Sequence, residues 1–548
     1  MGPVNRAWAC EPGVEAMNPE VRHRIVADRY RDSVSLLALA ARLREVVGID
    51  GASAVMATPA NLETVVAGGF TVPDGVRPND LLISVRGTGA ACVEAMDRLD
   101  SLLAGPTGRS ASVSEAVVPR TLRQAMLTNP ESGLALISVP GPYAAAEAAK
   151  ALDLGLHVML FSDNVSVEDE VALKAAAADR GLLMMGPDCG TAVINGVPLG
   201  FANVVARGPI AVIGASGTGM QEIIARIHRL GSGVSQAIGT GGRDLSDAVG
   251  ARTMIRALTM ISEDPSTEIV IVVSKPPSAA VLDRVFSHIA ALRAHGRLRI
   301  PVVGAFLGID ATRLAGSEVI GASSLAHASD IAVALVEGRS PAAARQEPLP
   351  PLTARPRPAG SQRWLRAAFC GGTFSYEAQF ALAERGIRVA ANAPIEGNTT
   401  IASSPELVGI AQWPDSHAVL DLGSDEFTVG RPHPMLDPTV RDDFLIDAWR
   451  DPSTAVILFD VVLGHGSAAA PVVALLDRLI AQRRGCPSGD EPIAIAHVCG
   501  TELDPQNRDA IIVALGGAGV TVAGSNFEAA AWAGQVLRQL ELTSRLKP

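Results

Sequence analysis

The apolar residues of this 548-residue chain occur in short runs that alternate with amphipathic stretches. Leu134–Val139, Val158–Phe161 and Leu182–Met185 are such runs, and the residues between them have helical spacing. Runs of about four to eight apolar residues between helices are typical of buried parallel strands. The same alternation resumes at Ile210–Ile213 and again at Val456–Val462. It predicts a multidomain α/β chain with parallel-sheet domains of Rossmann-like and flavodoxin-like type.

The pattern also predicts where the domains begin and end. A cluster of prolines between Pro348 and Pro358 is typical of a semi-rigid linker, which we place at residues 341–361. The other expected segments are an N-terminal extension at 1–24, a small α/β domain at 25–120, a Rossmann-type domain at 125–200, a flavodoxin-type domain at 205–340 and a C-terminal flavodoxin-type domain at 362–540.

Composition narrows the class of protein. Hydrophobic residues make up 48% of the chain and charged residues 19%, which suits buried sheets, and the net charge of −11 comes with scattered Lys and Arg residues. We therefore expect small-molecule substrates and no nucleic acid or membrane partner. The six cysteines form no CxxC pair, which predicts neither a metal site nor disulfides and favours a reducing, cytoplasmic location. No apolar run approaches the ~20 residues of a membrane span, and no signal peptide is recognisable.

Two Gly-Thr turns carry the clearest chemical signal. In each half a buried strand runs into a small-residue loop that opens a helix, as in Ile210–Gly219 and Arg366–Thr373. Free amides and the positive end of the helix dipole favour phosphate at such a turn. The plain alternative is that small residues only allow a tight turn, and neither loop is a Walker A motif. The candidate phosphate-binding residues are Ser216, Gly217, Thr218, Gly371, Gly372 and Thr373.

Three further loops hold candidate site residues. Asp188 follows a buried strand where α/β sheets bind ligands, although a plain turn explains it nearly as well. Arg243 and Asp244 follow a glycine loop and predict an anion clamp, with an exposed loop that holds a local ion pair as the alternative. Arg431 and His433 lie on a proline-stiffened loop suited to orienting a carboxylate, and we treat them as catalytic candidates.

Several of these segments resemble succinyl-CoA synthetase. Gly186-Pro-Asp-Cys-Gly, Ser216-Gly-Thr and Gly239-Thr-Gly-Gly resemble loops of its α subunit in the same order, and 456–531 resembles the ligase domain of its β subunit. Motifs such as Val429-Gly-Arg-Pro-His-Pro-Met resemble the FdrA family of acyl-CoA synthetase-like proteins. The resemblance implies that 125–200 is CoA-binding-like, that 362–540 is ligase-like, and that the chain works as an oligomer with separate partner subunits.

The departures from the synthetase shape the functional expectation. The synthetase has a phosphorylated histidine in a Gly-His-Ala-Gly motif, and Gly308–Gly316 holds no counterpart of it. The glutamate that steadies this phosphohistidine in the synthetase has no match around Lys275. An ATP-grasp domain is also absent from the sequence. His327 lies downstream and is interpreted as a helix residue. The FdrA resemblance implies an oxamate carbamoyltransferase, in which phosphate cleaves oxalurate to oxamate and carbamoyl phosphate.

In that hypothesis the two Gly-Thr turns hold phosphate, and Arg431 or Arg243 binds the oxalurate carboxylate. Phosphate is then a co-substrate, no cofactor is firmly implied, and CoA or a nucleotide stays open. The alternatives are an NDP-forming acyl-CoA ligase subunit and a non-catalytic regulatory or scaffold subunit that binds phosphate or CoA.

Overall fold

The computed structural model describes residues 19–27, 29, 31, 33–104, 119–314, 316–344, 361–401, 414–428, 432–485 and 491–545. The chain forms two compact units, Met1–Ser114 and Glu115–Pro548. Most of the expected extension and, at 345–360, most of the expected linker lie outside the described residues. No described helix has the length and apolarity needed to cross a bilayer.

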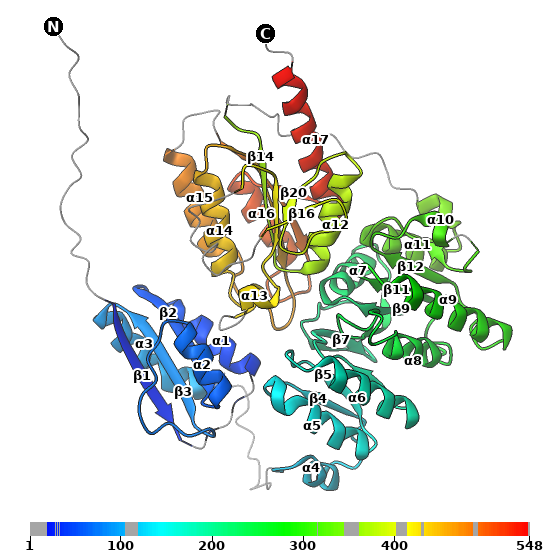
Figure 1. Ribbon diagram of the computed structural model, residues 1–548, viewed down its shortest axis with the longest axis horizontal. Coiled ribbons are helices and arrows are strands. Elements are labelled where there is room, and N and C mark those ends of the chain that lie inside the picture. Colours follow the sequence, from blue (N-terminus) through cyan, green and yellow to red (C-terminus); the bar gives the residue numbers. More distant parts are fainter. Residues whose placement is uncertain are drawn as a thin grey trace. The chain divides into compact units, whose positions relative to one another are not determined.

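The first unit is a small α/β domain built on an antiparallel sheet with strand order β1-β3-β2 (Figure 1). The middle strand β3 is buried along almost its whole length, and its Leu81, Ile83 and Val85 pack on Leu43 of α1 and Leu99 of α3. The elements are β1 (Glu20–Val26), α1 (Ser33–Arg44), β2 (Ile49–Met56), α2 (Pro59–Ala67), β3 (Leu81–Gly87) and α3 (Gly89–Ala104).

The second unit begins with a three-stranded parallel sheet of order β4-β5-β6. Alanines of α5 face this sheet, and Ser166 caps α6 by accepting a hydrogen bond from the amide of Asp169. The elements are α4 (Leu122–Thr128), β4 (Leu134–Ile137), α5 (Gly141–Asp153), β5 (His157–Leu160), α6 (Val167–Asp179) and β6 (Met184–Met185).

A seven-stranded sheet of order β13-β12-β11-β9-β10-β7-β8 follows. Strands β9 to β13 are parallel, whereas β7 and β8 form an antiparallel hairpin at the edge, so residues 191–200 join this sheet and not the preceding one. The elements are β7 (Thr191–Ile194), β8 (Val197–Gly200), β9 (Arg207–Ala215), α7 (Gly217–Arg229), β10 (Val234–Gly239), α8 (Arg252–Ile261), β11 (Ile269–Ser274), α9 (Ala279–Ala294), β12 (Val302–Phe306), α10 (Ala311–Leu314), β13 (Ile320–Gly321), α11 (Leu325–Val336) and the 3-10 turn η1 (Pro341–Ala344).

The C-terminal half forms a second seven-stranded sheet, parallel throughout, of order β16-β15-β17-β14-β18-β19-β20. Helices α14 and α15 cover one face, and α12 and α17 pack together on the other (Figure 1). The elements are β14 (Trp364–Phe369), α12 (Gly372–Ala383), β15 (Ala390–Ala391), β16 (Thr399–Thr400), β17 (Ala418–Asp421), α13 (Asp425–Thr428), α14 (Thr439–Arg450), β18 (Thr454–Val462), α15 (Val473–Gly485), β19 (Ile493–Cys499), α16 (Arg508–Gly517), β20 (Thr521–Ala523) and α17 (Asn526–Arg545).

The two large sheets share a central arrangement of five parallel strands. The orders are β10-β9-β11-β12-β13 in one sheet and β17-β14-β18-β19-β20 in the other, so β9 and β14, the strands that run into the two Gly-Thr turns, occupy matching places. The helix after this strand is α7 in one half and α12 in the other, and these two helices contact each other. The multidomain α/β prediction is therefore confirmed, and ligand sites are expected at the carboxyl ends of the strands.

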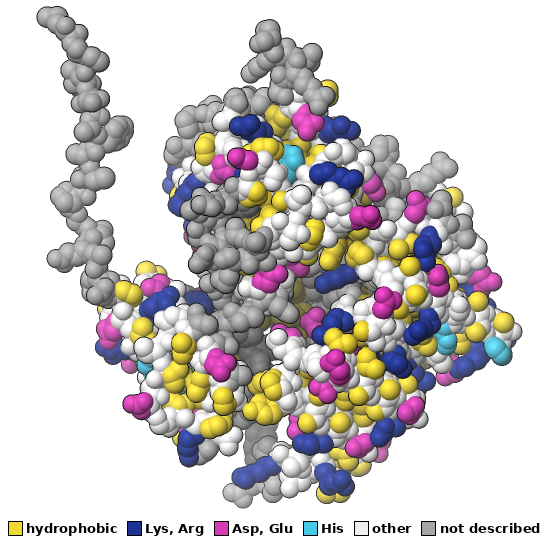
Figure 2. Space-filling model, viewed as in Figure 1, with side chains coloured by type: hydrophobic (Ala, Val, Ile, Leu, Met, Phe, Trp, Pro, Cys, Tyr) yellow, Lys and Arg dark blue, Asp and Glu magenta, His cyan; other side chains and the backbone are white. Residues whose placement is uncertain are grey.

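The surface carries mixed charge. Figure 2 shows Lys and Arg side chains interspersed with Asp and Glu over the visible face of each unit (Figure 2). This matches the scattered basic residues of the sequence.

Candidate functional site

The two Gly-Thr turns, predicted separately from the sequence, meet in the structure. Ser216 caps α7 by accepting a hydrogen bond from the amide of Gly219 at 3.1 Å. Its hydroxyl also shares a 2.6 Å hydrogen bond with that of Thr373 in the first turn of α12. Both side chains are buried. The N-termini of two helices, one from each half, therefore lie side by side.

Part of the glycine signal comes from this contact. A Cβ on Gly371 would lie 2.5 Å from the side chain of Thr218, closer than real Cβ contacts allow, so Gly371 is required by the packing of α12 on α7. A Cβ on Gly217 would meet only the Thr191 hydroxyl, at 3.6 Å. Packing of α12 on α7 therefore explains Gly371, while it leaves Gly217 unexplained.

The amides of the first helical turns are available to a ligand. Within the described residues, the backbone N–H groups of Gly217, Thr218, Gly372 and Thr373 donate to no protein acceptor. The first N–H groups of a helix have no partner inside the helix. Two such sets, added to two aligned helix dipoles, suit an anion with several oxygens.

A lysine from the first half reaches the start of α12. The register of β11 pairs Ser274 with Ala215, so Lys275 emerges beside the α7 turn. Its ammonium lies 3.1 Å from the position that a Cβ on Gly372 would take. No carboxylate among the described residues forms an ion pair with Lys275. Its positive charge therefore adds to the potential at the helix N-termini.

Asp421 closes the other side of the same turn. It ends β17, and the register pairs it with Phe369 at the end of β14. Its Oδ2 lies 2.5 Å from the position of a Cβ on Gly372, and its Oδ1 accepts a hydrogen bond from the amide of Gly423. Any side chain at residue 372 would displace both Asp421 and Lys275, which explains this glycine.

His433, one of the two catalytic candidates, lies partly buried near this cluster. Its Nδ1 accepts a hydrogen bond from the amide of Met435 at 3.2 Å, which leaves the ring proton on Nε2. Burial and the charge of Lys275 lower the pKa of His433 to about 4, so the ring is neutral at neutral pH. Nε2 is then a hydrogen-bond donor. The other candidate, Arg431, lies outside the described residues.

Arg243 and Asp188 lie on loops at the carboxyl ends of β10 and β6. The Arg243 side chain donates to Glu170 Oε2 at 3.0 Å and to the carbonyl of Val165 at 2.8 Å. The ion pair of Arg243 is therefore formed with Glu170 of α6, 73 positions away in the chain. Asp188 lies against Gly242, with its Oδ2 3.3 Å from the position of a Cβ there. A substrate-binding role for Arg243 and Asp188 stays a prediction.

The neighbouring charges belong to a buried network. Lys174 on α6 donates to Asp244 Oδ1 at 2.7 Å and to the carbonyl of Thr240, and it pairs with Glu170. Asp244 also accepts the amide of Met254 in the first turn of α8. This network fastens the small parallel sheet to the second sheet.

Sequence reasoning missed a second repeat below the turns. Gly217 is followed five positions later by Glu222, and Gly372 is followed at the same spacing by Glu377. Both carboxylates are almost fully buried. An alignment of the two helix starts would have found this pair of glutamates from the sequence alone. Lys275 could not be found in that way, because the turn that it approaches, at Gly372, belongs to the other half of the chain.

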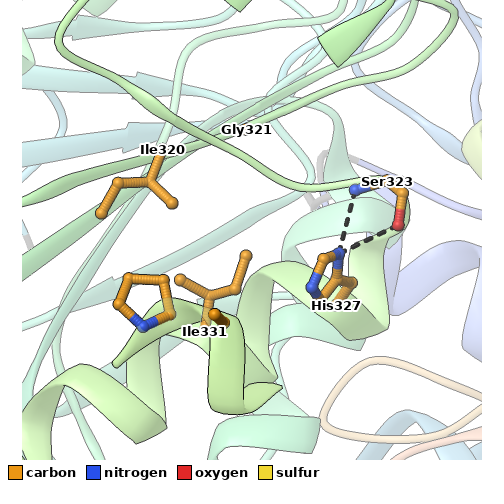
Figure 3. Close-up of a pocket in the computed structure, with 7 residues that line it drawn as sticks. Ile320, Gly321, Ser323, His327 and Ile331 are labelled. Atoms are coloured by element: carbon orange, nitrogen blue, oxygen red, sulfur yellow. Dashed lines mark hydrogen bonds between the residues drawn. The ribbon is translucent and has the colours of Figure 1, made fainter. Parts of the chain in front are cut away.

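His327 lies away from the turns, on α11. It borders a pocket of about 430 Å³ with Ile320 and Ile331, and its Nδ1 accepts hydrogen bonds from the amide and the hydroxyl of Ser323 (Figure 3). Burial lowers the pKa of His327. The interpretation of His327 as a helix residue fits this position.

Comparison with known families assigns the main parts of the chain. Residues 206–292 match the CoA binding domain, residues 368–536 match the CoA-ligase domain, and residues 17–118 match the domain described as "AllF, heavy metal-associated domain". Among the described residues no group of three or more His, Cys, Asp or Glu side chains is placed to hold a metal ion.

One relative and one solved structure align with parts of this chain as follows. The α subunit of an ADP-forming succinate–CoA ligase of Aquifex aeolicus is 27% identical over 31% of this chain, which spans 61% of that subunit. A dinucleotide-forming acetyl-coenzyme A synthetase of Ca. Korarchaeum cryptofilum aligns at 14% identity with a TM-score of 0.29, covering 76% of this chain and 86% of that one.

The uncharacterized protein YahF of Escherichia coli K12 is 40% identical over 514 residues, covering 92% of this chain and 96% of that protein. The chain therefore belongs to the YahF family, and it carries CoA-binding and CoA-ligase domains of the succinyl-CoA synthetase type.

Proposed function

We propose that the chain is the phosphate-handling subunit of an acyl-CoA synthetase-like ligase, and that phosphate attacks or leaves an acyl carbonyl where α7 and α12 begin. The observation that carries this proposal is the meeting of Ser216 and Thr373 at 2.6 Å, with Lys275 beside them. The CoA-binding and CoA-ligase domain matches support thioester chemistry.

The proposed step exchanges a thioester for an acyl phosphate. An oxygen of hydrogen phosphate attacks the carbonyl carbon of an acyl-CoA, the C–S bond breaks, and CoA leaves as the thiol with the proton that hydrogen phosphate gives up. Amides of both helix N-termini and Lys275 neutralise the phosphate charge, and His433 donates from Nε2 to the substrate. In this proposal the nucleotide step is assigned to a separate partner subunit.

A second candidate reaction uses the same phosphate. The absence of a histidine between Gly308 and Gly316 removes the carrier that moves phosphoryl groups in the synthetase, and this favours direct attack by phosphate on a carbamoyl carbonyl. In that reaction phosphate cleaves oxalurate, the C–N bond breaks, and oxamate leaves with carbamoyl phosphate as the other product. A bound carboxylate would then be oriented by residues such as His433 or Arg431.

One assay separates these candidates. The full chain, alone and with the products of neighbouring genes, is incubated with labelled phosphate and either succinyl-CoA or oxalurate, and the acyl or carbamoyl phosphate formed is trapped with hydroxylamine. Product from succinyl-CoA supports the ligase, and product from oxalurate supports the carbamoyltransferase. Phosphate binding without product from either substrate would support the alternative of a non-catalytic regulatory subunit. Absence of phosphate binding would refute the proposal.

A further inference from the structure

Glu222 and Glu377 occupy equivalent turns of α7 and α12, yet their surroundings differ. Their side chains are 0% and 2% exposed. Glu222 forms ion pairs with His497 at 2.8 Å and with Arg229 at 3.4 Å. Glu377 accepts hydrogen bonds from the amide of Leu325 and the side-chain amide of Asn526, both at 2.9 Å. One carboxylate therefore has an arginine and a histidine as partners, and the other has only neutral donors.

The partners of Glu377 come from two further helix starts. Leu325 begins α11 in the first half, and Asn526 begins α17 in the second. Asn526 also donates to the carbonyl of Phe374, within α12 itself. Glu377 thus ties α12 to both halves directly beneath the turn that holds Thr373.

The charged groups around Glu377 are paired with one another and not with Glu377, although the charge of Arg226 acts against the rise of its pKa. On α7 the negative Glu222 faces Arg226 and Arg229, and Arg226 is paired with Asp330 of α11. His497 of β19 is bound to Glu222, and Glu528 of α17 accepts the amide of Gly524. No cationic side chain of the described residues forms an ion pair with Glu377.

This arrangement makes Glu377 titrate near neutrality. Burial raises the pKa of Glu377 to about 7, and the negative charge of Glu222 contributes in the same direction. The two hydrogen bonds oppose the rise without overcoming it. A carboxyl group of this kind exchanges its proton in the physiological range.

We propose that Glu377 is a positioning residue whose proton controls anion binding at the start of α12. Thr373 and Glu377 are four residues apart, so they lie on one face of the helix about 6 Å apart along its axis. When Glu377 loses its proton, a buried negative charge appears one turn below the anion. Anion binding and proton uptake are therefore coupled. This inference rests on the proposed phosphate site.

Sulfate is the probe for this coupling, because it stays a dianion across the range in which phosphate itself titrates. Its affinity for the full-length chain is measured by calorimetry from about pH 5.5 to pH 9 at constant ionic strength. We expect the affinity to fall about tenfold as pH rises through 7, as repulsion between close charges in a protein interior predicts. Buffers of different ionisation enthalpy should report proton uptake on binding above pH 7.

Three variants test the assignment. Glu377→Gln carries no titrating proton and should bind sulfate with a flat pH profile near the low-pH affinity of the wild type. Glu377→Asp should restore a pH-dependent profile, and this rescue keeps the test valid if Gln disturbs the packing. Glu384→Gln changes an exposed carboxylate at the end of the same helix and should retain the wild-type profile.

The outcomes separate the two proposals. Sulfate binding that is flat with pH in the wild type, or a Glu377→Gln profile that still falls about tenfold, would overturn the role of Glu377 and leave the phosphate site intact. No sulfate or phosphate binding at any pH would overturn both.

Discussion

The side-chain amide of Asn203 donates to Asp504 Oδ2 across 2.8 Å, in a place where both residues are almost fully buried. Asp504 also accepts the amide of Val204 at 2.7 Å and that of Thr501 at 2.8 Å. The segment after β8 is thereby fixed to the loop after β19, in the other half of the chain. One carboxylate satisfies three buried donors at this junction.

Removing that carboxylate should weaken the junction. Asp504→Ala removes an acceptor that serves three N–H donors, of which Asn203 keeps its bond to the carbonyl of Leu463, and we expect it to lower the free energy of unfolding by about 2–4 kcal/mol. Urea denaturation followed by circular dichroism measures the change. Asp509→Ala, at an exposed position on the neighbouring helix, is the control and should change stability by less than about 0.5 kcal/mol. A similar effect of both variants would contradict the assigned role.

Lys275 should contribute charge to phosphate binding. Lys275→Met keeps much of the side-chain volume and removes the ammonium, so phosphate affinity should fall about tenfold, while Lys275→Arg should retain more of it. Calorimetric titration with phosphate measures both. Lys150→Met removes an exposed lysine of α5 and should bind phosphate as the wild type does. Wild-type affinity in Lys275→Met would exclude Lys275 from the site.

Two glycines of the turns should respond differently to the same substitution. Gly371→Ala places a Cβ against Thr218, and such overpacking should destabilise the chain by about 1–3 kcal/mol. The Cβ of Gly217→Ala would make only an ordinary contact with the Thr191 hydroxyl, so this variant should leave stability nearly unchanged while it weakens phosphate binding. Unfolding and phosphate titration of the two variants test this. Unchanged phosphate affinity in folded Gly217→Ala would show that the α7 turn serves packing alone.

The ion pair of Glu222 with His497 should make stability depend on acid pH. Burial acts to raise the pKa of Glu222, but His497 and Arg229 outweigh it and lower the pKa from 4.5 to about 2. A carboxyl group with a lowered folded-state pKa stabilises the fold above its unfolded pKa, and this contribution is lost as pH falls through about 2. Its size at neutral pH is about 3 kcal/mol.

Glu222→Gln removes this contribution. The difference in unfolding free energy between wild type and Glu222→Gln should therefore be largest at pH 6 and shrink steadily below about pH 4.5. Glu263→Gln, at an exposed carboxylate, provides the matched control. A difference that stays constant from pH 6 to pH 3 would argue against the ion pair as the source.

Periodicity and turn chemistry predict the fold class and the Gly-Thr turns because both are local properties of the chain. They also place Ser216 and Thr373 at equivalent helix starts, which the structure brings together. They do not reveal that Gly371 is required by Thr218, or that Lys275 arrives at Gly372. Those contacts depend on how the two halves pack. The contact of Arg243 with Glu170 was missed for the same reason, since Glu170 lies on α6, 73 positions earlier in the chain.

The hydroxyls of Ser216 and Thr373 meet although 157 positions separate them on one chain. Because both halves are carried by the same polypeptide, their encounter is intramolecular, with an effective concentration that dilution cannot lower. The two helix starts are also present in a fixed one-to-one ratio. The affinity of the site for phosphate should therefore be the same at nanomolar and micromolar protein, whereas a site divided between two chains would disassemble as the protein is diluted below their dissociation constant.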